Sequence, residues 1–159
     1  MASEDGRALL RHTLATLAYR AGKAIRDAPE GFAEFRVAET SRTPGQILAH
    51  IGDLLDWGLS LAEGAQRWQD STPLPWPEEC RRFFAALKKF DDRLADAAPL
   101  PCSTESLFQG PVADSLTHVG QLTMLRRLAG GPIKGENYHK ADIVVGRVGA
   151  EQTAPKREF

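Results

Sequence analysis

The sequence has only two cysteines, Cys80 and Cys102, among its 159 residues. They do not form a Cys-x-x-Cys pair, and without an export signal we expect both to be reduced and structural. The N-terminus carries Glu4 and Asp5 in place of a basic and then apolar leader, and no apolar run approaches the ~18 residues that cross a bilayer. We therefore expect a cytoplasmic protein that does not span a membrane.

An excess of charge of one sign is also missing. Twenty lysines and arginines stand against 21 acidic residues, giving a net charge of -1, and the two signs are interspersed, which argues against a nucleic-acid surface. The sequence contains neither a glycine-rich phosphate loop nor a nucleophile elbow. Its spaced glycine pair, Gly146 and Gly149, does not sit at a strand-to-helix turn. We do not expect nucleotide chemistry.

The apolar residues that are present recur with a helical period and predict an all-α fold. The four predicted helices run from about residue 4 to 27, 41 to 64, 77 to 98 and 111 to 130, and Thr43 before Pro44 is the predicted N-cap of the second. The intervening connections are longer than the two to eight residues that join neighbouring antiparallel helices, so we expect at least one crossover.

The length favours one domain, organised as a four-helix bundle over residues 1–130 and a C-terminal extension over 131–159 that packs on the bundle. Within the extension, residues 141–145 could form a short strand or part of an extended tail, and the pattern does not decide between them.

Chemically versatile side chains gather on the fourth predicted helix. Asp114 and His118 lie one turn apart, and with Gln121 they share a face that the apolar pattern predicts to be buried. A carboxylate beside an imidazole there can satisfy its partner, bind a metal or transfer protons. Asp114 alone has another interpretation, because a carboxylate close after Pro111 is also typical of a helix start.

The remaining candidates are fewer. His50 lies on the second predicted helix at the border of its apolar stripe, close to Trp57. His12 falls on the polar side of the first helix, and the direction of His139 in the C-terminal extension cannot be derived. Among the other residues considered, the bland interpretation is favoured: a solvated charge for Asp53, surface positions for Asp91 and Asp92, and packing for Trp57, Trp68 and Trp76.

Two motifs together resemble the DinB-like (DinB/YfiT-like) superfamily of metalloenzymes. One is Thr43-Pro44-Gly45-Gln46-Ile47-Leu48-Ala49-His50-Ile51-Gly52-Asp53 with Trp57, and the other is His118-Val119-Gly120-Gln121 followed by Leu125-Arg126-Arg127. The resemblance implies a four-helix bundle in which a histidine of the second helix and an H-x-x-x-H pair of the last core helix hold a divalent metal, often zinc or nickel. Carried over, it implies His50 and His118 as ligands.

The third ligand position departs from the family pattern, because Asp114 stands where the typical member has histidine. Two imidazoles and a carboxylate can still bind zinc, nickel, iron or manganese. We therefore predict His50, Asp114 and His118 as metal ligands, with Gln121 and Trp57 lining the site. The alternative is a lapsed site, in which the same three residues form a hydrogen-bonded buried cluster.

The resemblance implies an enzyme, a thiol S-transferase or a hydrolase, that uses a metal-activated thiol or water. Its partners would be a small-molecule substrate and a low-molecular-weight thiol. Arg126, Arg127 and Lys134 are candidates for a basic rim that binds the thiol's acidic groups, and the alternative interpretation is that they are helix-end charges. Family members also pair as homodimers. The alternative function is a non-catalytic small-molecule-binding or dimerising helical bundle.

Overall fold

The computed structural model describes residues 4–159 and is all-helical over that range, with no strand. Its long helices are α1 (Glu4–Ile25), α2 (Pro44–Ala62), α3 (Trp76–Ala95) and α5 (Ala113–Leu128), and shorter helical segments are η1 (Phe32–Glu34), α4 (Thr104–Leu107), η2 (Phe108–Val112) and η3 (Tyr138–Lys140). None of these helices is both long and apolar enough to cross a membrane.

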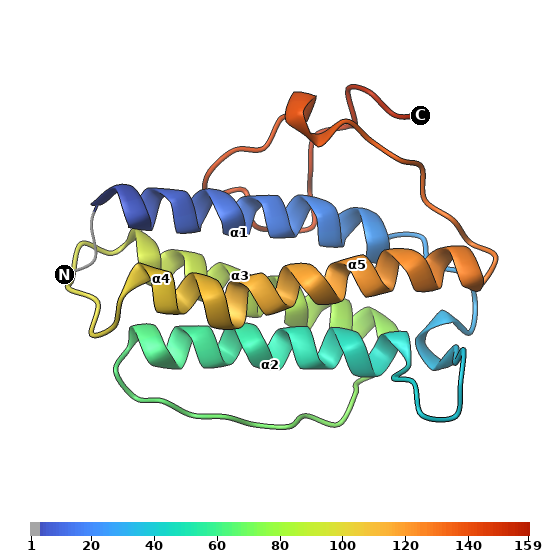
Figure 1. Ribbon diagram of the computed structural model, residues 1–159, viewed down its shortest axis with the longest axis horizontal. Helices are drawn as coiled ribbons and strands as arrows, with labels where there is room; N and C mark the ends of the chain where they lie inside the picture. Colours follow the sequence, from blue (N-terminus) through green and yellow to red (C-terminus); the bar gives the residue numbers. More distant parts are fainter. Residues whose placement is uncertain (1–3) are drawn as a thin grey trace.

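The four long helices form a bundle in which α1 and α2 each pack against both α3 and α5 (Figure 1). Helices α2 and α3 run in the same direction, so residues 63–75 must return along the length of α2 before α3 begins. This segment is the predicted crossover connection. The interior is filled by large apolar side chains from every long helix, including Leu14, Leu17, Leu48, Ile51, Leu55, Phe83, Leu87, Phe90 and Leu122.

Local sequence explains where α2 begins. The Thr43 hydroxyl accepts a hydrogen bond from the backbone N–H of Gln46 at 3.2 Å, and the Gln46 side-chain oxygen accepts one from the Thr43 N–H at 2.9 Å. This capping box satisfies two amide groups, and Pro44 supplies a first residue that needs no donor. The predicted N-cap is confirmed, and it fixes the first turns of the helix that carries His50.

The last core helix begins earlier than the sequence suggested. Ser103 caps α4, and the chain continues through the π-helical segment η2 into α5. Pro111 therefore lies inside a helical stretch, where proline interrupts the regular hydrogen bonding and a π-helical turn absorbs the disturbance. The predicted fourth helix is α5, but it does not begin at a free helix end near Pro111, because α4 and η2 precede it without a break.

Residues 131–159 lie across α1 (Figure 1). Buried Glu136 accepts hydrogen bonds from the Tyr19 hydroxyl and, at 2.9 Å, from Lys23 Nζ. Burial and the Glu136 bond raise the pKa of Tyr19. The segment predicted to be a strand or an extended tail forms no strand, and the one β-bridge in the described chain joins Glu136 to Glu158.

Candidate metal site

Three predicted ligands from two adjacent helices come together in the structure. His50 lies on α2, and Asp114 and His118 lie one turn apart on α5, which packs against α2. One ligand atom from each residue lies within 4.8 Å of the others. The i, i+4 spacing on α5 directs both of its side chains to the same side, so that packing of α2 against α5 completes the group.

The three residues are close enough together to hold one metal ion, with ligand atoms that all lie within 4.8 Å of one another. Asp114 Oδ1 lies 3.4 Å from His118 Nε2, and Asp114 Oδ2 lies 3.8 Å from His50 Nε2. Both distances are too long for good hydrogen bonds. Ligands bound tetrahedrally to zinc at ordinary bond lengths lie about 3.3 Å apart. The Asp114 side chain makes no hydrogen bond within the described residues, so the three side chains lie close together without the hydrogen bonds that the alternative interpretation expects of them.

The site opens to solvent on the Asp114 side. The side chain of Asp114 is 47% exposed, whereas those of His50 and His118 are 19% and 12% exposed. Gln121 is exposed as well. The prediction of a buried polar stripe was therefore wrong for Asp114 and Gln121, because this face of α5 lies at the edge of its contact with α2. An open edge gives a metal and a small molecule a path to the two imidazoles.

The charge state of His50 favours metal binding. Burial lowers its pKa, as do the nearby positive charge of Arg42 and the neighbouring His118. The imidazole therefore stays neutral to lower pH than an exposed histidine and keeps a lone pair available. Two imidazoles with one carboxylate are a ligand set that zinc, nickel, iron and manganese all accept.

Of the two residues predicted to line the site, Gln121 contacts His118 directly, whereas Trp57 packs against Trp68. The Gln121 side-chain oxygen lies 2.8 Å from His118 Nδ1. The Trp57 ring does not stack on either imidazole. It packs edge to face against Trp68, with 6.0 Å between ring centroids, and Trp68 packs against His50, with 5.7 Å between centroids. Trp68, interpreted from sequence as packing, is therefore a direct neighbour of His50.

Asp114 does not cap a helix. Residues on both sides of it are helical, and no side chain caps the junction at Val112. The capping interpretation depended on a helix start at Pro111, which the structure does not have. Asp114 is thus left without a backbone partner, and the two imidazoles are its neighbours.

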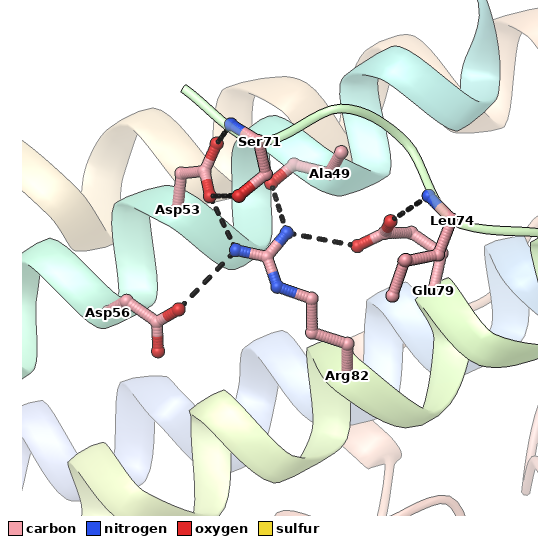
Figure 2. Close-up of polar contacts among 7 residues, drawn as sticks. All are labelled: Ala49, Asp53, Asp56, Ser71, Leu74, Glu79 and Arg82. Atoms are coloured by element: carbon pink, nitrogen blue, oxygen red, sulfur yellow. Dashed lines mark hydrogen bonds and ion pairs between the residues drawn. The ribbon is translucent and has the colours of Figure 1, made fainter. Parts of the chain in front are cut away.

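Two acidic residues expected at the surface are buried instead. Asp53 accepts hydrogen bonds from Ser71 and pairs with Arg82, as Figure 2 shows. Asp91 receives two hydrogen bonds from Arg11, at 2.9 and 3.0 Å. Single-helix periodicity placed these carboxylates outside the apolar stripes, but cations on neighbouring elements allow them to be buried.

Arg126 does not supply a basic rim to the site. Arg126 is buried, and its guanidinium donates hydrogen bonds to the carbonyls of Ala24, Arg26, Asp27 and Gly131, where it closes the end of α1. It is therefore committed to backbone groups. His12 is exposed on α1 as predicted, and exposed His139 lies in η3 of the tail, outside the group of His50, Asp114 and His118.

Comparison with known proteins adds no relative to this description. No family model, curated protein or solved structure gives a significant match to the chain. The resemblance to the DinB-like superfamily thus stays a prediction from the two motifs.

Proposed function

We propose that this chain is a divalent-metal-binding protein of the DinB-like type, with His50, Asp114 and His118 as its protein ligands. The observation that carries the proposal is the spacing of Asp114 from the two imidazoles, 3.4 and 3.8 Å, with no hydrogen bond to either. A carboxylate placed between two neutral donors at these distances is well suited to a cation. Zinc and nickel are the metals we favour.

The proposed reaction class is metal-dependent thiol transfer or hydrolysis. Three protein ligands leave coordination positions for a water or a thiol, whose pKa a bound divalent metal lowers. Asp114 contributes one negative charge and faces solvent at the open edge, while His50 and His118 form the drier side. A small substrate would therefore approach past Asp114.

A zinc titration with alanine variants tests the proposal. We expect the purified, tag-free protein to bind about one zinc per chain, and His50→Ala or His118→Ala to abolish this binding while far-UV circular dichroism is unchanged. His12→Ala is the matched control, because His12 is exposed on α1 and outside the group. Zinc binding that survives in both site variants would contradict the assignment and favour a non-catalytic bundle with a lapsed site.

A further inference from the structure

The two imidazoles of the candidate metal site are oriented in different ways. His118 has Gln121 as a hydrogen-bond partner on Nδ1, the nitrogen that faces away from Asp114. His50 makes no hydrogen bond through its Nδ1 within the described residues. Its ring instead packs edge to face against Trp68 at 5.7 Å and against His118 at 4.8 Å. Packing by Trp68 takes the place of the outer hydrogen bond that usually orients a metal-binding histidine.

Trp68 owes its position to a segment with no regular secondary structure. It lies on the crossover of residues 63–75, which follows α2 (Figure 1), and 47% of it is exposed. The segment is anchored to α2 next to Trp68, because Ser60 Oγ accepts a hydrogen bond from Arg67 N–H at 3.0 Å. Ser60 Oγ also lies 3.3 Å from the Arg67 carbonyl, and the Trp68 ring packs against Trp57 of α2. These contacts hold only the first part of the crossover, so the rest of the segment needs further anchors.

A buried ion network supplies the other anchors, as Figure 2 shows. The Asp53 carboxylate accepts hydrogen bonds from the Ser71 backbone N–H at 2.8 Å and from its hydroxyl at 2.6 Å. Glu79 Oε2 accepts one from the Leu74 N–H at 2.8 Å. Arg82 pairs with both carboxylates, and so joins the crossover to α2 and α3 at once.

The network acts on the same turn of α2 that carries His50. Arg82 Nη1 donates to the Ala49 carbonyl at 3.2 Å, and Asp53 lies three residues after His50. The side chains of Asp53 and Glu79 are 3% and 0% exposed, so their charges need the guanidinium beside them. Arg82 can satisfy both because its planar fork offers several donors in fixed directions.

We propose that the Arg82–Asp53–Ser71 network is a positioning device for the metal site, which holds Trp68 against His50 and thereby fixes the orientation of that imidazole. The inference rests on the proposed function. Asp53, Ser71 and Arg82 are positioning residues, since they act through Trp68 and do not touch the metal. The crossover of residues 63–75 then forms an ordered side of the metal site.

Two variants test the positioning role of the network, and neither leaves a buried charge without an ion-pair partner. Trp68→Ala removes the contact itself, from a half-exposed side chain. Asp53→Ala releases Ser71 while Arg82 keeps Glu79 at 3.1 Å and Asp56 at 3.4 Å. Gln66→Ala is the control, because Gln66 is exposed on the same crossover. Trp68→Phe tests rescue by another ring.

Two readouts are required. In metal-free protein, we expect the NMR signals of the His50 ring protons to shift in Trp68→Ala and Asp53→Ala, but not in Gln66→Ala. With metal, we expect both variants to bind zinc about tenfold more weakly than wild type and to alter the visible spectrum of bound cobalt. Trp68→Phe should bring the zinc affinity and the cobalt spectrum back towards those of wild type. A loss of stability alone would not change the cobalt spectrum.

The outcomes separate this inference from the proposed function. Wild-type protein that binds zinc, together with Trp68→Ala or Asp53→Ala variants of equal affinity and unchanged cobalt spectrum, overturns the positioning role and leaves the metal site intact. The positioning role is also overturned if the NMR signals of the His50 ring protons do not shift in Asp53→Ala. Wild-type protein that binds no zinc overturns the proposed function, and the positioning role with it.

Discussion

His118 carries a hydrogen bond that fixes which of its nitrogens can bind a metal. An amide oxygen only accepts, so the Gln121 oxygen at 2.8 Å requires the proton on Nδ1 of His118. The lone pair of the neutral ring is then on Nε2, the atom that faces Asp114. Gln121 thus selects the tautomer that the proposed site needs.

Removing this acceptor should weaken the site without removing a ligand. We expect Gln121→Leu to lower zinc affinity about tenfold, because the His118 ring loses the partner that sets its tautomer and orientation. The measurement is a zinc competition titration with a chelator of known affinity. Gln66→Leu, an exposed change on the crossover, serves as the control. Equal affinities in Gln121→Leu and wild type would contradict this role.

The two thiols should be unreactive in the folded protein. Burial raises the pKa of Cys80 from 9.0 to about 11, and it also raises that of Cys102. Both cysteines are free. At pH 8 we expect iodoacetamide to modify both cysteines more slowly in native than in urea-unfolded protein, since only the thiolate reacts.

The raised pKa of Cys80 also makes the stability of the folded protein depend on pH. A raised pKa in the folded state means that the folded protein holds its proton more tightly than the unfolded chain. The Cys80 contribution is therefore complete below pH 9.0 and is lost as the pH rises towards about 11. Native alkylation of Cys80 as fast as in urea at pH 8 would contradict the burial of this thiol.

Among the elements, α2 and η2 approach each other more closely than ordinary side chains allow. A Cβ placed on Gly58 of α2 would lie 2.8 Å from the Phe90 ring on α3 and 3.1 Å from Pro111 in the π-helical segment η2. Glycine therefore lets the three elements meet. Since α5 continues directly from η2, this contact helps to set the position of Asp114 relative to α2.

We expect Gly58→Ala to destabilise the protein by about 1–3 kcal/mol, because the buried Phe90 ring and Pro111 must shift. Gly120→Ala is the matched control: Gly120 also lies within a helix, but its added Cβ would meet nothing within 4 Å. That change should stabilise α5 by up to about 1 kcal/mol. Urea unfolding of both variants measures the difference, and equal effects of the two substitutions would contradict the close approach.

At the scale of the whole molecule, the tail and the candidate metal site occupy different parts of the bundle. Glu136 ties the tail to α1 through Tyr19 and Lys23, whereas the proposed ligands lie on α2 and α5. Removing one member of a buried ionic group leaves the others without compensation. The tail should therefore affect stability more than metal binding.

We expect Glu136→Ala to lower the free energy of unfolding by about 3 kcal/mol, because Lys23 is left with Glu158 at 3.9 Å as its acidic partner. Zinc affinity should remain that of wild type wherever the variant is folded. Urea unfolding and a zinc titration provide the two values. A variant as stable as wild type, or one that loses zinc while folded, would show that the tail has another role.

The number of long helices and the shared side of Asp114 and His118 followed from local patterns in the sequence, whereas His50 was proposed as a ligand from the resemblance to the DinB-like superfamily. Apolar period gives α1, α2 and α3, and the one-turn spacing on α5 puts Asp114 and His118 on one side of it. The π-helical turn before Asp114 and the approach of Trp68 to His50 depend on contacts between distant segments. The apolar period of a single helix carries no information on contacts between distant segments. For the same reason, the sequence did not mark Arg82 as the partner of Asp53.

A crystal structure of zinc-loaded protein, with anomalous scattering recorded at the zinc edge, would show whether the site exists. We expect one strong anomalous peak between α2 and α5, at about 2.0–2.2 Å from the Nε2 atoms of His50 and His118 and from an Asp114 carboxylate oxygen. Absence of a peak there, in crystals grown with excess zinc, would contradict the claim that these three residues form a metal site.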